Sequence, residues 1–255
     1  MAFNIYCGGK LPPVRTTDMI ALSDHLDKAS TWPLVPPMGW EFAVNPRAWG
    51  MLGNDTVGDC AIAGLMHLIQ GQSANIGDPL FATTKQAIDL YSAVTGYNPN
   101  DPDSDQGTVV TDLLKYAVQH GVQMTDSMGK VVTVKILAYA SLDVSSIAQM
   151  RYASYTFGGS LLGINCPNKC EEDTTNWNFA PGLPSAGGHL ITRMGEGSQG
   201  GKVISWGMVI PTSNQFILGY ADEGYIVLSD RWVNAQGKSP TGLDLNSLLN
   251  AAKEI

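Results

Sequence analysis

The chain has 255 residues, 44% of them hydrophobic, and a net charge of -8. A chain of this size buries roughly 70 to 75% of its unfolded surface, which excludes a disordered protein, a collagen-like rod and a disulfide-stapled miniprotein. Because 23 acidic side chains outnumber 15 basic ones, the chain repels phosphate backbones. We therefore expect no nucleic-acid partner.

Two further features concern the location of the protein. No apolar run reaches the roughly 20 residues that span a bilayer, so we expect no membrane association. The first residues, MAFNIYCGGKLPP, lack the basic start and apolar stretch of a signal peptide. The sequence thus predicts a soluble, cytoplasmic protein that the Sec route does not export.

Residues 1–52 predict an extended N-terminal arm that is rich in proline and tryptophan. The prolines disfavour both helices and a regular sheet, and the tryptophans would anchor the arm by packing. One short helix is expected over 17–28, capped by a threonine at its start. The three aromatic anchors are Trp32, Trp40 and Trp49.

Residues 53–158 predict a mainly helical lobe. From Asp59 onward, apolar residues recur at helical spacing, and Asp59 is a good N-cap for the helix. Further helices are expected over 84–94, 109–120 and 144–152, with an alternating strand over 130–137.

Residues 159–255 predict a mainly β lobe. The strand-like runs are 159–164, 189–194, 202–206, 215–218 and 224–228. Helices thus come first and strands later, whereas a parallel sheet would need alternating βαβ units. This segregation predicts the α+β class.

A cysteine opens the helix that follows Asp59. A thiol there feels the positive end of the helix dipole, which favours the thiolate and lowers the pKa. The preceding loop is rich in glycine and polar residues, and its donors could point to a developing oxyanion; Asn54 lies six residues before Cys60. Cys60 is therefore a candidate nucleophile, and the alternative is a cysteine that only packs in the core.

A nucleophilic cysteine needs a base, and the chain has four histidines. His67 lies two turns along the helix from Cys60, too far to touch the sulfur. His120 ends a predicted helix, and His25 lies in a polar segment. His189 follows two glycines and opens a strand, so it could face a cleft with little bulk beside it. The alternative is an ordinary hydrogen-bonded histidine at the start of a strand.

The order and spacing of these residues resemble the papain-like cysteine peptidases. The resemblance lies in Asn54, Cys60, His189 and the segment Ser205-Trp206-Gly207. Residues 105–122 resemble the paired-glycine loop and following helix of the family, and 221–228 resemble its closing strand. The motifs GND...GDC and GGH are also similar to those of uncharacterised papain-like proteins of soil bacteria and phages.

The resemblance implies a papain-like α+β fold, with a helical lobe followed by an antiparallel β lobe and the site in the cleft between them. It implies a hydrolase, a peptidase or amidase, that acts on a peptide or protein. Cys60 would be the nucleophile and His189 its partner, while Asn54 and the Cys60 backbone would stabilise the oxyanion. Neither a cofactor nor a metal is expected.

Two departures from the family pattern concern the orientation of the histidine and the stabilisation of the oxyanion. Ile204 stands where the family has its ring-orienting asparagine, so Ser205, Asn178 or a backbone carbonyl takes that role, or nothing does. Trp206 is expected to line the cleft. Asn54 is one methylene shorter than the family glutamine.

A second reading is a papain-fold protein without catalysis. Such a chain would be a structural or binding component, for example of a phage particle, with a protein partner on its N-terminal arm and a location in the virion. Residues 166–179 contain Cys166 and Cys170 but no histidine, which predicts a surface loop and not a metal site.

Overall fold

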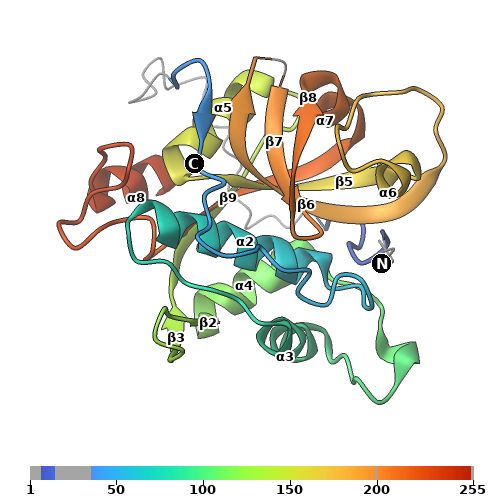
Figure 1. Cartoon of the computed structure of the whole chain (residues 1–255), viewed down its shortest axis with the longest axis horizontal. Coiled ribbons are helices and arrows are strands. Elements are labelled where there is room, and N and C mark those ends of the chain that lie inside the picture. Colours follow the sequence, from blue (N-terminus) through green and yellow to red (C-terminus); the bar gives the residue numbers. More distant parts are fainter. Residues whose placement is uncertain (1–6, 15–35, 199, 254–255) are drawn as a thin grey trace.

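The fold is built on one large antiparallel sheet. The computed structural model describes residues 7–14, 36–198 and 200–253. Seven strands form the sheet in the order β4-β9-β5-β6-β7-β8, with β1 paired to β6 (Figure 1). The strands are β1 (Trp40–Glu41), β4 (Ile136–Ser141), β5 (Ser160–Pro167), β6 (Ser185–Gly197), β7 (Gly200–Ser205), β8 (Met208–Ser213) and β9 (Ala221–Ser229). The predicted α+β class is confirmed.

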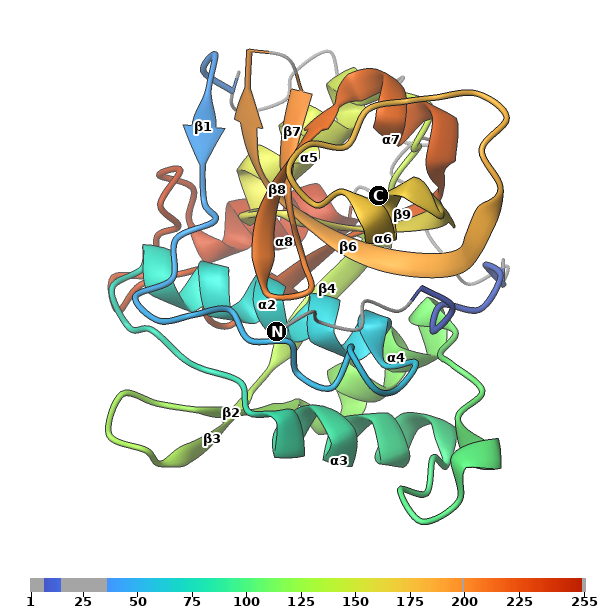
Figure 2. The same ribbon diagram turned by 45° about the vertical axis from the view of Figure 1, so that its right-hand side comes forward.

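Helices cover the sheet from two sides. They are α2 (Cys60–Asn75), α3 (Thr84–Thr95), α4 (Val110–His120), α5 (Ile147–Phe157), α6 (Lys169–Glu172), α7 (Asn214–Tyr220) and α8 (Leu245–Lys253), with the short 3-10 helix η1 (Pro102–Ser104). Helix α2 lies directly beneath the sheet, with α3 and α4 below it, whereas α5 and α7 lie above (Figures 1 and 2). A hairpin of β2 (Val122–Thr125) and β3 (Val131–Val134) flanks α3. Strand β4 and helix α5 lie before residue 158, yet β4 belongs to the large sheet and α5 packs on it. The predicted division into a helical lobe and a β lobe at residue 158 therefore stays a prediction.

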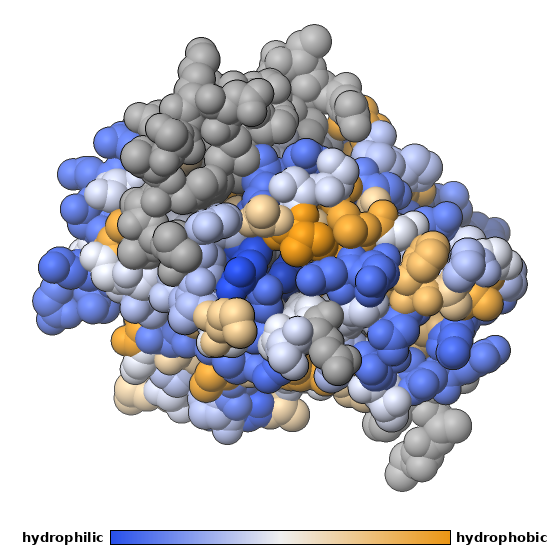
Figure 3. Space-filling model, turned by 90° about the horizontal axis from the view of Figure 1, so that it is seen from above, coloured by the Kyte–Doolittle hydropathy of each residue, from blue (hydrophilic) through white to orange (hydrophobic). Residues whose placement is uncertain are grey.

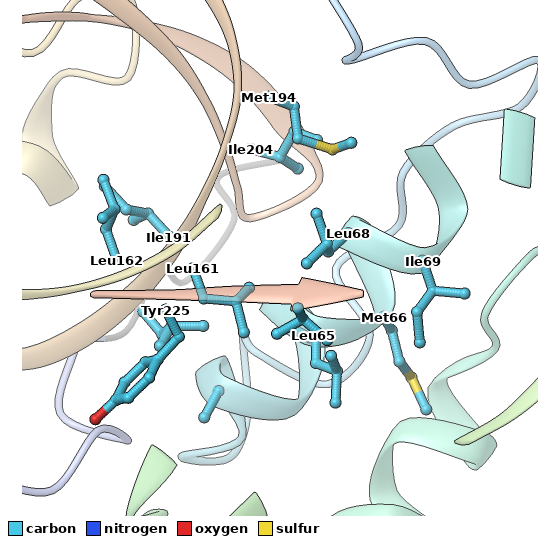
Figure 4. Close-up of a cluster of buried hydrophobic side chains, with 14 of the residues drawn as sticks. Leu65, Met66, Leu68, Ile69, Leu161, Leu162, Ile191, Met194, Ile204 and Tyr225 are labelled. Carbon is cyan, nitrogen blue, oxygen red and sulfur yellow. The ribbon is translucent and has the colours of Figure 1, made fainter. Parts of the chain in front are cut away.

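Helix α2 is the buried core helix and packs against β6. Two glycines one heptad apart allow the close approach: a Cβ on Gly64 would lie 2.4 Å from Leu190 Cδ2, and one on Gly71 would lie 2.2 Å from Met194 Cε. Around this contact, Leu65, Leu68 and Ile69 of α2 meet apolar side chains of the sheet (Figure 4). The first turn of α2 is thereby fixed against the strand that carries His189.

Most predicted helices and strands are found within a few residues of their expected bounds, and one element was wrong. The predicted strand 215–218 is helix α7. Ser213 caps it, since its Oγ accepts a hydrogen bond from Phe216 N, and the buried Phe216 and Ile217 face the core. The cap and the helical spacing outweigh the strand propensity of a short apolar run.

Segment 166–179 is only in part the predicted surface loop, since it is exposed and irregular after α6 but contains buried anchors. It starts within β5 and continues through the short helix α6. Cys166, Cys170 and Trp177 are all buried, because the segment folds back onto the sheet, where Trp177 bonds through its backbone to β8. The polar residues between these three made the segment look like a loop.

The described part of the N-terminal arm packs on its own body. Trp40 in β1 and Trp49 are both buried, and the Trp40 and Phe42 rings lie 5.2 Å apart between centroids. The predicted helix 17–28 and Trp32 lie outside the described residues. The arm is thus extended and anchored by aromatic residues where it can be followed.

The outer surface is mixed in polarity. One face, seen in Figure 3, is largely hydrophilic, with hydrophobic residues gathered in small groups. None of the helices in the described part of the chain combines the length and apolar character that crossing a bilayer requires.

A buried glutamine joins α2 to the rest of the fold. Gln72 Nε2 donates to the carbonyls of Phe157 and Val227, and its Oε1 accepts from Ser229 Oγ. Replacing Gln72 by methionine leaves these groups buried without partners, so we expect the free energy of unfolding to fall by about 2 to 4 kcal/mol. Urea unfolding measures this, with exposed Gln123→Met expected to change it by no more than about 0.5 kcal/mol. Equal losses in the free energy of unfolding for the Gln72 and Gln123 variants would contradict the bridging role of Gln72.

Candidate active site

Cys60 is the first residue of α2, and its thiol lies against the strand of the candidate base. Only 1% of Cys60 is exposed, and the sulfur accepts a hydrogen bond from the backbone of Leu190. Leu190 directly follows His189 in β6. The fold therefore brings Cys60 and the start of β6 together, although they are far apart in the sequence.

His189 is fully buried and held by two neighbours from the β7–β8 turn. Its Nε2 lies 2.8 Å from Ser205 Oγ, and its ring stacks on Trp206 with centroids 4.6 Å apart. The other ring nitrogen, Nδ1, has no hydrogen-bond partner among the described residues. One nitrogen is thus bonded to a hydroxyl, while the second makes no hydrogen bond to Cys60 or to any other group in the described part of the chain.

The turn that supplies these neighbours is a tight hairpin. Ser205 pairs with Met208, which leaves Trp206 and Gly207 as a two-residue loop. Both have positive φ, 47° and 69°, as a type I′ turn requires. A tryptophan seldom adopts this left-handed conformation, and here it places the indole over the imidazole. Ile204, the residue before Ser205, is buried in the core near Met194 (Figure 4).

Asn54 lies in the loop before α2. This loop folds on itself, since Thr56 N and Val57 N both donate to Gly53 O. Asn54 is buried, and its side-chain oxygen has no hydrogen-bond partner among the described residues. The amide group is therefore held in the polar loop that leads to Cys60.

Asp59 does not act as the predicted N-cap. It occupies the cap position, but its side chain makes no capping hydrogen bond. The carboxyl is fully buried, and neither oxygen has a hydrogen-bond partner among the described residues. Burial, with the negative charge of Asp105 nearby, raises the pKa of Asp59 well above its usual range. A buried carboxyl with a raised pKa thus sits directly beside the candidate nucleophile.

An extended segment, residues 7–14, lies over Cys60 and His189. Gly8 N and Lys10 N both donate to Gly188 O, while Thr108 N donates to Gly9 O and Leu11 N donates to Thr108 O. Gly188 belongs to β6, and Thr108 precedes α4. The segment therefore bridges the helical side and the sheet side of the site, running between them in Figure 2.

Glycines make room for this segment. A Cβ on Gly188 would lie 2.2 Å from Lys10 O, and one on Gly9 would lie 2.3 Å from Gly58 O. Gly58 is fixed in turn, because its N–H donates to both carboxylate oxygens of Asp105. The two glycines before His189 thus leave space that the backbone of residues 8–10 occupies.

Burial controls the charges of Cys60 and His189. It raises the pKa of the Cys60 thiol to about 12 and lowers the pKa of His189 to about 3. Both groups are therefore neutral at pH 7. The expectation of a lowered thiol pKa is wrong for this covered state, because desolvation outweighs the helix dipole.

The other candidates lie apart from this pair. His67 is buried, and its Nε2 contacts the carbonyls of Trp49 and Gly50. His120 stacks on Tyr116 at the end of α4, and His25 lies outside the described residues. Asn178 is exposed and lines surface pockets, whereas Nε2 of His189 is bonded to Ser205 Oγ. The structure thus favours Ser205 over Asn178 as the partner of the ring.

The remaining cysteines form a buried thiol cluster beside the same segment. Cys7 Sγ lies 2.9 Å from Cys166 Sγ, and Cys170 is a further close neighbour of Cys166. All four cysteines are free thiols. Within residues 7–14, 36–198 and 200–253, no group of histidine, cysteine or carboxylate side chains is arranged to hold a metal ion.

The sequence pattern did not identify the covering segment or Asp59. In the sequence, the signal for the segment is the pair Gly8-Gly9, which matches the pair Gly187-Gly188 that it contacts. Asp59 was recognised only as a cap. The raised pKa of its buried carboxyl depends in part on the charge of Asp105, which comes from a distant loop.

Solved structures with the same fold were found by comparison. Xylellain, a cysteine protease from Xylella fastidiosa, is 12% identical, with 88% of this chain and 96% of that chain covered and a TM-score of 0.62. Procathepsin L2 from the larval midgut of Tenebrio molitor is 14% identical, covers 89% and 79%, and has a TM-score of 0.63. The Carica candamarcensis cysteine protease CMS1MS2 is 14% identical, covers 76% and 99%, and has a TM-score of 0.55. This chain has the papain-like fold.

Sequence comparison alone gives no relatives. No family model matches the chain, and no curated protein matches it. The likeness to the papain-like proteases is thus one of fold.

The first prediction from the site concerns the reactivity of Cys60. We expect iodoacetamide to label Cys60 slowly at pH 7, since the thiol is covered and neutral. Gly9→Val should displace the segment, because even a Cβ lies 2.3 Å from Gly58 O, and should raise the labelling rate at least about 10-fold. Peptide mass mapping separates Cys60 from the other thiols. The exposed Val14→Ala is the matched control and should label like the wild type; fast labelling of the wild type would contradict the covered state.

The second prediction concerns pH. Burial lowers the pKa of His67 to about 4 and that of His189 to about 3, so below about 6.5 the unfolded chain binds protons that the folded chain does not. The free energy of unfolding should therefore fall as the pH drops from 7 to 4.5. His67→Gln should reduce this loss by about 2 kcal/mol in urea unfolding. The exposed His120→Gln should not reduce it. The raised pKa of Asp59 increases the free energy of unfolding as the pH falls. This contribution is the same in the wild type and in both histidine variants.

Proposed function

We propose that this protein is a papain-like cysteine hydrolase that cleaves a peptide or amide bond. The observation that carries the proposal is the extended segment across Cys60 and His189, held by backbone hydrogen bonds to Gly188 and Thr108. A site that binds one peptide backbone in this way is suited to bind another. The papain-like fold supports the same conclusion.

The mechanism starts once the segment is displaced and water or substrate enters the cleft. With its cover removed, the desolvation that holds both groups neutral is reduced, and the helix dipole then favours the Cys60 thiolate. His189 Nδ1 accepts the thiol proton. The thiolate attacks the carbonyl carbon of the substrate, and the imidazolium gives the proton to the leaving amine. A water then hydrolyses the thioester and frees Cys60.

Ser205 is the positioning residue in this mechanism. If His189 Nε2–H donates to Ser205 Oγ, the lone pair on Nδ1 is available for the thiol proton. Trp206 covers this hydrogen bond from one side by stacking on the ring. The hydroxyl thus replaces the asparagine that the family uses, one residue from where that asparagine would align, and Ile204 stays in the core.

Asn54 and the backbone N–H of Cys60 would stabilise the oxyanion. The N–H of a residue in the first turn of a helix is free of intrahelical bonds, and the Asn54 amide lies in the loop that leads to it. Together they would supply two donors to the tetrahedral oxygen. The unpartnered Nδ1 of His189 at this place is typical of a site that is completed by a ligand.

The alternative is a binding or structural protein without catalysis, and its virion location stays a prediction. The reactivity of the Cys60 thiol distinguishes the two functions. A hydrolase requires Cys60 to become reactive when the segment moves, whereas a packing cysteine does not.

The nucleophile is tested in the uncovered protein. Gly9→Val should release peptides from fluorescein-labelled casein, and adding Cys60→Ala should abolish the release while leaving the melting temperature nearly unchanged. Cys166→Ala is the matched control, since it removes another buried thiol that the mechanism does not use. Casein cleavage that survives Cys60→Ala would refute the assignment.

The role of Ser205 is tested by kinetics. In the Gly9→Val background, Ser205→Ala should lower kcat about 10- to 100-fold with little change in KM, because it orients the base without touching the substrate. The exposed Ser198→Ala should leave kcat unchanged. A purely structural role would lower the melting temperature and not kcat.

A further inference from the structure

The covering segment places a buried cation beside the active site. Lys10 has 1% of its side chain exposed, and its Nζ lies 3.1 Å from Asp222 Oδ2 and 2.9 Å from Glu223 Oε1. A buried ammonium group is costly unless it is paired. A pocket that admits this side chain therefore has to compensate its charge, and here two acidic residues at the start of β9 do so.

The pocket has the shape of a lysine side chain. Gly163 of β5 forms its wall, and a Cβ there would lie 2.7 Å from Lys10 Cε and 2.8 Å from Lys10 Cδ. Any side chain at this position would fill the space that the aliphatic stem takes. Gly163 and Glu223 are directly paired across β5 and β9, so the space for the stem and the carboxylate for the head are built on neighbouring strands.

The carboxylate at the end of the pocket is fixed in place. Glu223 is 7% exposed, and its Oε2 accepts a hydrogen bond from Tyr225 Oη at 2.7 Å. Among the residues that the structure describes, its Oε1 has no partner other than the ammonium group that the ion pair supplies. Without a cation, this carboxylate is a buried negative charge that lacks its counter-ion. Asp222, at the mouth, is 38% exposed by its side chain.

The pocket is coupled to the reacting groups through one backbone contact. Lys10 N donates to Gly188 O, and Gly188 directly precedes His189. Lys10 is also close enough to Cys60 for its charge to act on the thiol. A residue whose side chain enters the pocket is therefore held next to the Cys60–His189 pair.

We infer that Gly163, Asp222 and Glu223 form a specificity pocket that selects a lysine or arginine side chain of a peptide substrate, and that Lys10 fills this pocket as a pseudosubstrate. This inference rests on the proposed function and adds the class of substrate. A peptide with a basic residue in the place of Lys10 makes the same backbone hydrogen bonds and the same ion pair as the segment. Peptides with an uncharged residue leave Glu223 buried without its counter-ion, and so bind more weakly.

Peptide binding tests the pocket without relying on catalysis. The protein is the full chain with Gly9→Val, Lys10→Ala and Cys60→Ala, which displaces the segment, vacates the pocket and prevents turnover. The probe is a fluorescein-labelled peptide with the sequence of residues 7–13, with serine at the first position. A matched probe has norleucine in place of lysine. Fluorescence anisotropy should give at least about 10-fold tighter binding for the lysine peptide, the gain expected from one compensated charge.

A pocket variant and a control complete the test. Adding Glu223→Gln should remove most of the preference for lysine and raise the melting temperature of the Lys10→Ala protein, since it removes an unpaired buried charge. Glu172→Gln, at an exposed glutamate of α6, should change neither. Equal affinities for the two peptides, or no binding of the lysine peptide, would overturn the inference.

The outcome is distinguishable from a failure of the proposed hydrolase. If the lysine preference is found but casein is not cleaved by the Gly9→Val protein, the pocket stands and the catalytic assignment falls. If casein is cleaved while the two peptides bind equally, the hydrolase stands and the pocket assignment falls.

Discussion

The close packing of α2 on β6 is the constraint on which the site depends. Gly64 and Gly71 allow the helix to lie against Leu190 and Met194 at a distance that any larger residue would prevent. Because interiors are packed as densely as organic crystals, this contact leaves little freedom to the first turn of α2. Cys60 is therefore held beside Leu190, the residue that follows His189. No hydrogen bond joins the side chains of Cys60 and His189 in the described structure.

Desolvation decides the state of that pair. The helix dipole is worth about 0.3 to 1 kcal/mol at an exposed end, whereas a rise of the thiol pKa from 9.0 to about 12 corresponds to about 4 kcal/mol. Burial is thus the larger effect, and under the proposed mechanism the dipole acts only when the segment leaves. The same segment that demonstrates how a peptide binds also keeps the pair neutral.

The sequence predicted those parts of the fold that local patterns determine. The stripe of apolar residues after Asp59 depends on neighbours along the chain, so helix α2 was found where it was expected. The role of Ser205 remained one of several alternatives, because a hydrogen bond to His189 depends on the β7–β8 turn and on the positive φ of Trp206.

Other features could not be predicted because they depend on distant parts of the chain. The short run around Phe216 was taken for a strand, although Ser213 caps it as a helix. The covering segment needs a gap between Gly58 on one side and Gly188 on the other, and Lys10 needs acidic residues of β9 more than two hundred positions away. A pattern of neighbouring residues contains none of this information.

The charge state of His189 tests the account most directly. Nitrogen-15 NMR of the imidazole ring reports its protonation as a function of pH. In the wild type, the ring should stay neutral at pH 7 and down to about pH 4, as burial under the segment requires. In Gly9→Val it should be protonated at pH 7 and return to neutral when Cys60→Ala is added, since the thiolate is then lost as its partner. A ring that is protonated in the wild type, or neutral at pH 7 in all three proteins, would contradict the account.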